Sequence, residues 1–364
     1  MSNKSLPVLG VVIVTYNSED VILDCLESLL AARSVRLHIV LVDNASTDRT
    51  VETLRDWASG ATAHAPPADA PFAVPVSAKP LVLHEAAPGD APADAGLTLL
   101  HAGVNGGFAA GVNLGLAHLA QRPEIGRFWI LNPDSLVPPE TPAAFAAWPE
   151  PEGGFSLMGG RLLYHDAPER IQGDGGRYNR LTGVTSNINF SRRHAEAAAP
   201  SAERFDFICG GSMVASRAFY ERAGPLPEDY FLYYEEVDWA QRRGGLPLVH
   251  CPSGIVYHRA GTAIGSPTMS RGPSVLSAYF LHRARMRFMR RHHPASLPIA
   301  YGYGLAKAAQ FLLKGHRAQA AALLRALHGA GPPVALCAAL GPGALRRLSA
   351  GSLQTRSLPE SPGA

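Results

Sequence analysis

The sequence predicts an α/β fold built on a mostly parallel sheet, and three observations support this prediction. Apolar, β-branched runs at residues 8–15, 37–42, 97–100 and 128–131 alternate with segments whose apolar residues recur at helical spacing. The runs are continuous, as is typical of strands covered on both faces, and right-handed crossovers make such strands parallel. Polar residues follow the strand ends, where open parallel sheets bind their ligands.

The helices of this series follow from capping and spacing. Residues 21–30 are apolar at helical intervals, Ser46 is expected to cap a second helix that carries Val51 and Leu54, and residues 108–119 follow a glycine-rich turn. Residues 61–96 interrupt the series with seven prolines, which predicts a mobile surface insert with a short strand at 80–83. Short apolar pieces predict additional, partly antiparallel sheet at residues 156–158, 161–164, 212–215 and 254–257.

Length and composition limit the domain organisation. A chain of 364 residues with 46% hydrophobic content accommodates one large α/β domain with an appendage, or two domains. We expect the α/β domain at residues 1–270, a basic helical region at 271–350 and a disordered tail at 351–364. The four cysteines lack metal-ligand spacing, which favours reduced thiols in a cytosolic protein. Residues 8–14 are too few for a signal sequence, and no apolar run is long enough to span a membrane.

The net charge of +3 conceals a strong asymmetry along the chain. Residues 239–359 contain sixteen Lys and Arg and no Asp or Glu, whereas the rest of the chain contains 17 basic and 30 acidic residues. This asymmetry indicates a polyanionic or membrane-surface partner. Nucleic acid is disfavoured, because no recognisable reading motif is present and few aromatic residues lie among the arginines.

One basic segment is the best candidate for contact with an anionic membrane. Residues 279–294 have apolar side chains on one helical face and basic side chains on another, and two histidines extend the basic end. The residues concerned are Leu281, Ala284 and Phe288 on the apolar face, Arg283, Arg287, Arg290 and Arg291 on the basic face, and His292 and His293. The apolar stretches 299–313 and 332–340 would add shallow burial. The alternative is a solvated basic helix packed on the main domain.

Two carboxylate-bearing motifs indicate group-transfer chemistry. In the stretch Phe-Trp-Ile-Leu-Asn-Pro-Asp-Ser at residues 128–135, Asp134 is presented in a polar loop after an apolar strand. A second stretch places Glu235, Glu236 and Asp238 at a predicted helix start, where unpaired backbone N–H groups favour negative charge. One acid that holds a metal and another that removes a proton are the minimum equipment for moving a group off a diphosphate.

Five segments, in this order, resemble family-2 glycosyltransferases, and most closely their bacterial rhamnosyltransferase-type branch. The segments are VIVTYNS at residues 12–18, VDNASTD at 42–48, NGGFAAGVN at 105–113, LNPD at 131–134 and FLYYEEVD at 231–238. The resemblance covers roughly residues 8–294. It implies a GT-A fold, a nucleotide-diphosphate sugar donor, Mg²⁺ or Mn²⁺ as cofactor, and inversion of the transferred sugar.

The resemblance also assigns residues to the donor. The nucleotide is expected at Thr15, Tyr16 and Asn17. Asp43, followed by Asn44, lies where the family binds a uracil or thymine ring, and a turn cap is the alternative role for this acid. The loop of Asn105, Gly106 and Gly107 is expected to pass the diphosphate, because glycine permits close backbone approach.

For the metal, the resemblance implies Asp134 and His258. Asn132-Pro133-Asp134 replaces the usual Asp-X-Asp motif, so the cation is expected to gain its other oxygens from the diphosphate and water. His258 matches a histidine that reaches the metal or the diphosphate in related enzymes. A structural turn acid at 134 and a merely hydrogen-bonded histidine at 258 are the alternatives.

The catalytic base implied by the resemblance is Glu236, where the family usually has Asp. One extra methylene moves the carboxylate by about 1.5 Å, and a misplacement near 1 Å can cost about 100-fold in rate, so Glu235 and Asp238 stay open as bases. At least one of the three is expected to cap the helix. The segment at residues 209–212, Cys-Gly-Gly-Ser, matches the lining of the acceptor side.

The sequence thus predicts an inverting hexosyltransferase of bacterial surface polysaccharide synthesis, working in the cytoplasm on the inner face of the membrane. The donor is expected to be a dTDP- or UDP-sugar, rhamnose being the first guess, and the acceptor a saccharide or lipid-linked saccharide. A nucleotidyltransferase is the first alternative, but Thr15-Tyr16-Asn17-Ser18 lacks the glycines and lysine of a phosphate loop. The second is a non-catalytic sugar-binding or scaffold relative.

Overall fold

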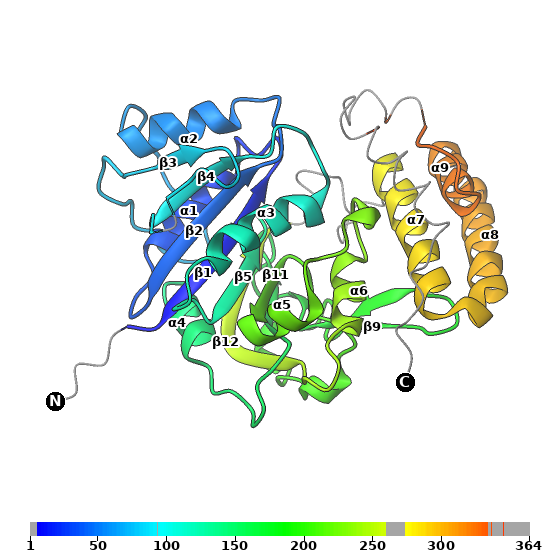
Figure 1. Ribbon diagram of the computed structural model, residues 1–364. Helices are drawn as coiled ribbons and strands as arrows, with labels where there is room; N and C mark the ends of the chain where they lie inside the picture. Colours follow the sequence, from blue (N-terminus) through cyan, green and yellow to red (C-terminus); the bar gives the residue numbers. More distant parts are fainter. Residues whose placement is uncertain (1–5, 93, 260–273, 334–335, 337–344, 346–364) are drawn as a thin grey trace.

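A ten-stranded sheet forms the centre of the molecule in the computed structural model, which describes residues 6–92, 94–259, 274–333, 336 and 345 (Figure 1). Its strand order is β3-β4-β2-β1-β5-β11-β7-β12-β6, with β8 paired to β7. The strands are β1 (Val8–Thr15), β2 (Arg36–Asp43), β3 (His84–Ala86), β4 (Leu97–His101), β5 (Arg127–Leu131), β6 (Ser135–Leu136), β7 (Leu157–Tyr164), β8 (Ile171–Gly173), β11 (Ser212–Ser216) and β12 (Val249–His258).

Helices cover both faces of this sheet, and a hairpin and a helical group complete the chain. The hairpin consists of β9 (Gly176–Tyr178) and β10 (Thr185–Asn187). The helices are α1 (Ile22–Leu30), α2 (Thr50–Ser59), α3 (Phe108–Ala120), α4 (Thr141–Ala147), α5 (Arg217–Ala223), α6 (Glu235–Gln241), α7 (Val275–His292), α8 (Leu297–Leu313) and α9 (Arg317–Leu327).

The predicted α/β class is confirmed. Strands β1, β2, β4 and β5 are mutually parallel where they pair, as the alternation of buried runs and helices predicts. The second half of the chain continues the same sheet, since β11 lies antiparallel between β5 and β7. The two pieces predicted at 156–158 and 161–164 form one strand, β7.

Two local predictions were wrong. The strand expected at 80–83 lies instead at β3, because Pro80 has no N–H to donate to a ladder and pairing with β4 begins only at His84. Ser46 does not cap α2, which begins at Thr50 without a side-chain cap. The Ser46 hydroxyl instead accepts the backbone N–H of Asn17 at 3.0 Å, which joins the loops after β1 and β2.

The core lies in two layers, one on each face of the sheet. Val12 and Val14 of β1 face one layer, whereas Val11 and Ile13 face the other. Helix α3 approaches the first layer closely because it carries glycine at Gly111, where a Cβ would lie 2.6 Å from a methyl of Val14. This close approach brings the loop before α3 to the carboxyl end of β1.

Part of the insert at residues 61–96 is anchored by a buried acid. The carboxylate of Glu27 in α1 is fully buried and accepts hydrogen bonds from Lys79 Nζ at 2.8 Å, from Ser77 N at 2.7 Å and from Trp57 Nε1 at 2.7 Å. A buried carboxylate is stable only with such partners. Residues 77–79 are therefore held against α1 and α2, which the proline-rich sequence did not indicate for a segment predicted to be mobile.

The C-terminal helices α7, α8 and α9 pack on one another and stand at one end of the sheet, next to α6 (Figure 1). Ala284 and Phe288 of α7 are buried, as the helical pattern predicts. The predicted basic face is not entirely available to a membrane, because Arg287 and Arg291 form ion pairs with Asp229 at 2.7 Å. In the described part of the chain, no helix combines the length and apolar character needed to cross a bilayer.

Several predictions fall partly or wholly outside the described residues. These are the tail at 351–364, much of the apolar stretch at 332–340 and Cys337. The other three cysteines are free, with Cys25 and Cys251 buried and Cys209 half-buried. Burial raises the pKa of the Cys209 thiol to about 12, with a contribution from the charge of Glu236, so this thiol is protonated at neutral pH.

Candidate active site

The loops after β1 and β2 meet at the edge of the sheet where the nucleotide was predicted. Thr15 and Asp43 are partners in the parallel register, and Thr15 Oγ1 donates to Asp43 Oδ1 at 3.4 Å. Asn17 has a left-handed backbone (φ 50°), and its side-chain oxygen accepts the Thr47 N–H at 2.8 Å. Tyr16, which lies between Thr15 and Asn17 in the sequence, is half-buried. These contacts fix two loops into one surface at the carboxyl ends of adjacent strands.

Asp43 has the local bonds expected of a turn cap. Its Oδ2 accepts the backbone N–H of Ser46 at 3.2 Å, and Ala45 between them has φ 61°. The side chain is nearly fully buried, with 4% exposed. The alternative role as a turn cap is therefore observed. It does not conflict with the predicted contact to a base ring, since an ionised carboxylate has about four acceptor sites.

Asn44 holds the glycine-rich loop in place. Its side-chain nitrogen donates to Asn105 Oδ1 at 3.1 Å and to the Gly107 carbonyl at 3.0 Å, while its oxygen accepts the Gly106 N–H at 3.1 Å. Gly107 has φ 88°, and a Cβ there would lie 2.4 Å from the carbonyl oxygen of Phe231. Only glycine fits this position. The loop predicted to pass the diphosphate therefore touches the segment that leads into the predicted catalytic acids.

Asp134 and His258 form a pair after β5 and at the end of β12. Asp134 Oδ1 lies 3.0 Å from His258 Nε2, and Asn132 Nδ2 lies 3.1 Å from the same nitrogen. The other ring nitrogen, Nδ1, lies 2.9 Å from Gln172 Oε1. In the protonated ring, the Nδ1–H donates to Gln172 Oε1 and the Nε2–H donates to Asp134 Oδ1, because an ionised carboxylate only accepts hydrogen bonds. Burial opposes protonation of His258, but the charge and hydrogen bond of Asp134 outweigh it and raise its pKa.

This donor set fits part of a divalent cation site. A carboxylate oxygen and an imidazole nitrogen side by side are both ligands that Mn²⁺ accepts, and Gln172 orients the imidazole as outer partners of metal-binding histidines do. Among the described residues, no group of three or more His, Cys, Asp or Glu side chains is gathered as a metal site. Asp134 and His258 would thus share the cation with the diphosphate and water, as the single acid at 134 implies.

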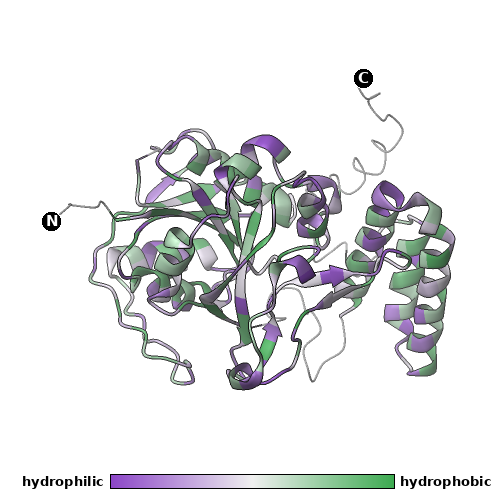
Figure 2. Cartoon of the chain, turned by 90° about the horizontal axis from the view of Figure 1, so that it is seen from below, coloured by the Kyte–Doolittle hydropathy of each residue, from purple (hydrophilic) through white to green (hydrophobic). Residues whose placement is uncertain are grey.

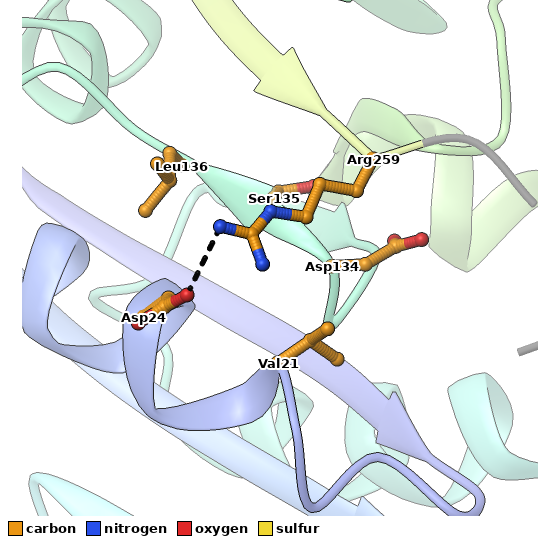
Figure 3. A pocket seen from close by; sticks show the side chains of 6 residues that line it. All are labelled: Val21, Asp24, Asp134, Ser135, Leu136 and Arg259. Carbon is orange, nitrogen blue, oxygen red and sulfur yellow. Dashed lines mark ion pairs between the residues drawn. The ribbon is translucent and has the colours of Figure 1, made fainter. Parts of the chain in front are cut away.

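Arg259, which follows His258, has a different partner. Figure 3 shows its guanidinium turned toward Asp24 of α1, whereas the carboxylate of Asp134 points away from it. The Arg259 Nη2 to Asp24 Oδ2 distance is 3.4 Å, and the Arg259 N–H donates to the Asp134 carbonyl at 2.9 Å. Arg259 thus ties the loop of Asp134 to α1. The sequence motif gave no sign of this contact.

Glu235 and Glu236 open helix α6 after an unusual backbone. Phe231, Tyr233 and Tyr234 all have φ between 68° and 69°, in the left-handed region. Such residues cost free energy and gather at functional sites. Glu235, Glu236 and Asp238 lie in the first turn of α6, but its N-cap residue, Tyr234, makes no side-chain cap hydrogen bond, so the predicted capping is not observed at that residue.

The two glutamates differ in access. Glu235 is 4% exposed, whereas Glu236 is half-buried and faces Gly210, where an added Cβ would lie 3.7 Å from Glu236 Cδ. Burial raises the pKa of Glu236 to about 7. Burial, together with the charge of Glu236, raises the pKa of Glu235 to about 8. Because the two carboxyls interact, they titrate as a pair near neutrality. Glu236 is the member of the pair that faces Gly210.

Gly210 and Gly211 lie between the two groups of predicted catalytic residues. Gly210 adjoins Glu236, and a Cβ on Gly211 would lie 3.6 Å from Asn132 Nδ2 and 3.7 Å from His258 Cε1. The antiparallel pairing of β11 with β5 sets this placement, and the Asn132 N–H donates to the Gly211 carbonyl at 3.0 Å. Two adjacent glycines thus lie within van der Waals reach of the acid and of the Asp134–His258 pair.

Asp238, the third candidate base, has a different environment. It is fully buried, and its Oδ2 accepts hydrogen bonds from Tyr230 at 2.8 Å, Arg291 at 2.8 Å and His292 at 3.0 Å. Burial would raise the pKa of Asp238, but the bonds from His292 and Arg291 prevail and hold it well below its usual range. Both carboxylate oxygens of Asp238 already accept hydrogen bonds within the protein, so its surroundings favour a structural role.

Comparison with known proteins bears on the fold and on the N-terminal part of the chain. Residues 10–65 match the family model for glycosyl transferase family 2. No curated protein matches the chain. The crystal structure of GalNAc-T7 with UDP, GalNAc and Mn²⁺ is similar, with a TM-score of 0.53 and 14% identity over 85% of this chain and 52% of that chain. This chain therefore spans about half the length of that protein.

A second structure covers almost the whole chain at a lower score. Mannosyltransferase PcManGT from Pyrobaculum calidifontis, in complex with GDP-Man and Mn²⁺, gives a TM-score of 0.48 with 20% identity over 96% of this chain and 87% of that chain. The predicted fold is shared with the GalNAc-T7 structure, whose TM-score is 0.53. Together with the family match over residues 10–65, it supports a role in sugar transfer.

Proposed function

We propose that this protein is an inverting glycosyltransferase that moves a sugar from a nucleotide diphosphate to a hydroxyl of a saccharide or lipid-linked saccharide. The observation that carries the proposal is the placement of Gly210 and Gly211 between Glu236 and the Asp134–His258 pair. An acceptor hydroxyl beside Gly210 meets a half-buried carboxylate whose pKa is about 7. A base of that pKa is suited to proton removal at neutral pH.

The mechanism is a single in-line displacement. Glu236 accepts the proton of the acceptor hydroxyl, the oxygen forms a bond to the anomeric carbon, and the bond from that carbon to the diphosphate breaks. One displacement inverts the configuration. A divalent cation held by Asp134 and His258 would supply positive charge where the diphosphate leaves. Asn44 keeps the loop of Gly106 and Gly107 in place for the phosphates, and Asp43 accepts hydrogen bonds from the base.

The donor is a dTDP- or UDP-sugar, and rhamnose is the first candidate, by the resemblance to the rhamnosyltransferase-type branch. The solved structure of GalNAc-T7 contains UDP, which agrees with a uracil-type donor for this fold. The nucleotidyltransferase alternative is weaker, because residues 15–18 form a loop fixed to Ser46 and Thr47 rather than a phosphate-binding turn. The non-catalytic alternative leaves the raised pKa of Glu236 without a use.

Release of nucleoside diphosphate from a panel of nucleotide sugars tests the proposal. We expect release from one dTDP- or UDP-sugar to depend on a saccharide or lipid-linked acceptor, with mass spectrometry showing a product heavier by one sugar residue. Release of inorganic diphosphate in place of nucleoside diphosphate would indicate a nucleotidyltransferase. Binding of nucleotide sugars without turnover of any donor and acceptor pair would indicate the non-catalytic relative.

For the membrane partner we propose an anionic inner-leaflet surface contacted chiefly by α8. Four large apolar side chains on this helix are exposed, opposite its buried residues Ala300, Ala308 and Phe311; they are Ile299 (51%), Leu305 (42%), Leu312 (52%) and Leu313 (89%). Figure 2 shows apolar residues on the C-terminal helices, which stand at one end of the molecule. Residues 274–333 contain nine Lys and Arg and no Asp or Glu, so the charge complements anionic lipid.

Vesicle sedimentation with the full chain tests this partner. We expect the protein to pellet with phosphatidylglycerol vesicles more than with phosphatidylcholine vesicles, and less as salt rises. A leucine side chain gains about 1.5–3 kcal/mol when it is fully buried in an apolar environment such as the membrane. Replacing Leu305, Leu312 and Leu313 together with serine removes this gain and should largely abolish pelleting. The exposed Leu181→Ser in the β9–β10 hairpin is the matched control. Equal pelleting with both lipids, or an unchanged triple variant, would contradict the proposal.

A further inference from the structure

Helix α7 packs on the residues that lead into Glu235 and Glu236. The ring of Phe231 stacks on Phe280 with centroids 5.0 Å apart, and the Tyr233 hydroxyl lies 2.8 Å from Ser277 Oγ. The ring of Tyr234 packs against Phe288, with centroids 5.6 Å apart. Each residue of the segment with a left-handed backbone thus has a partner on α7. A strained backbone persists only where its surroundings hold it.

Arg291 of α7 joins the two ends of this segment. Its Nη2 donates to Asp229 Oδ2 at 2.7 Å, and its Nη1 donates to Asp238 Oδ2 at 2.8 Å. Asp229 precedes the left-handed residues, and Asp238 follows Glu236 by two positions. The Arg291 guanidinium therefore bonds to one acid before and one acid after the strained backbone and the two glutamates. A lysine cannot reproduce this, because its ammonium is a single point charge.

Asp229 and Asp238 both have other partners besides Arg291. Asp229 also pairs with Arg287 at 2.7 Å, so it keeps a cation when Arg291 is removed. Asp238 is fully buried and keeps Tyr230, His292 and Arg242. Loss of Arg291 thus leaves both acids paired and keeps the bond from Tyr230 to Asp238, but it removes the ionic bridge between the Asp229 and Asp238 carboxylates. A variant at 291 therefore tests this bridge while the other contacts stay in place.

We propose that Arg291 is a positioning residue for Glu236, which fixes the catalytic carboxylate by tying Asp229 to Asp238 beneath the strained segment. The inference rests on the proposed function for the role of Glu236 as the base. It assigns α7, predicted from its arginines to bind a membrane, a second role as part of the active-site framework. The exposed apolar face of α8 is not involved.

Kinetics of Arg291→Ala and Arg291→Lys test this role. Because misplacement of a base by about 1 Å can cost about 100-fold, we expect kcat to fall by roughly 10- to 100-fold in the alanine variant, with the KM for the donor changed less than about twofold. The lysine variant can reach only one acid at a time, so its kcat should lie between those of the parent and the alanine variant. The neighbouring exposed Arg290→Ala removes the same charge from the same helix end and should keep the parent kcat.

A double-mutant cycle shows whether Arg291 acts through Glu236. In a Glu236→Gln background, loss of Arg291 should lower kcat by less than about twofold, because the group that it positions is gone. Additive losses, or a normal kcat in both Arg291 variants, would overturn the proposal. If the alanine variant does not fold, the lysine variant decides by the same criteria.

Amide hydrogen exchange gives a readout that does not need activity. Residues 231–236 should exchange faster in the Arg291 variants than in the parent, while β1 and β2 exchange at parental rates. Unchanged exchange at 231–236 in a folded variant overturns the proposal whatever the enzyme does. Conversely, a Glu236→Gln protein with normal turnover would refute the proposed base, and the exchange result would still decide the role of Arg291.

Discussion

Glu236→Gln should lower kcat by 100-fold or more, about 2.7 kcal/mol in activation free energy, with little change in donor binding. The amide keeps the size of the side chain but does not accept a proton. Initial rates at saturating acceptor, together with calorimetric titration of UDP, would separate the effects on turnover and on binding. The exposed Glu203→Gln is a matched control and should behave as the parent.

The pH dependence gives this prediction a second test. A general base acts when deprotonated, and the pKa of Glu236 is raised to about 7 by burial, so turnover should increase as pH rises through about 7. A carboxyl whose pKa is raised on folding stabilises the native state below its ordinary pKa and loses that contribution as pH rises through the folded value. At pH 8 the Gln variant should therefore be more thermally stable than the parent. A slow variant that is also less stable at pH 8 would indicate damage to the fold.

If Glu236→Gln is nearly normal, the neighbouring acids decide the assignment. A comparable loss from Asp238→Asn would transfer the role of base to Asp238, against the evidence of its buried ion pairs. A loss confined to Glu235→Gln would transfer it to Glu235, the less exposed member of the titrating pair.

Asp134→Ala should abolish transfer, leaving less than about 1% of the parental rate, because the chain offers one acid in this loop to hold the cation. Excess chelator should do the same to the parent, and Mn²⁺ or Mg²⁺ should restore activity. Titration of Mn²⁺ in the presence of UDP gives a readout apart from activity, and its binding should be lost in the variant. Asp166→Asn, an exposed acid, is the control.

Two outcomes would contradict the role of Asp134. Full activity of the parent in excess chelator would exclude an essential exchangeable cation. Normal Mn²⁺ binding by a folded Asp134→Ala protein would place the cation elsewhere. His258→Ala should weaken Mn²⁺ binding less than Asp134→Ala, since the imidazole carries no negative charge and a hard cation prefers oxygen.

Much of the donor side was predictable because its determinants are local. The strands β1, β2, β4 and β5 are largely buried runs; Asp43 is the last residue of β2, and Asp134 lies in the loop after β5. Right-handed crossovers then bring these acids to one edge of the sheet. Sequence reasoning failed where local signals competed. Ser46 has the chemistry of a cap, but the Asn17 N–H binds its hydroxyl first.

The partners that tune the site were not predictable, because they are distant in sequence and leave no periodic pattern. Gln172 orients His258 from 86 positions away, and Arg291 reaches Asp238 across 53. The contact between Gly107 and Phe231 depends on three left-handed residues that are not glycine, which no residue preference indicates. For the same reason, the sequence pattern predicted that the arginines of α7 contact a membrane and gave no sign of their contacts within the protein.

The pairing of β5 with β11 is the place where the sheet joins two parts of the chain. Within the described strands, it is the one pairing that joins residues 8–131 to residues 135–258. The predicted nucleotide surface and the loop of Gly107 lie in the first part, whereas Gly210, Gly211 and Glu236 lie in the second. The two parts also touch beside the sheet, where the Phe108 N–H donates to the Phe231 carbonyl at 3.0 Å and Asn113 Nδ2 donates to the Leu226 carbonyl at 2.9 Å. A displacement of the segment that carries Glu236 would therefore reach the loop of Gly107 directly, without passing through the sheet.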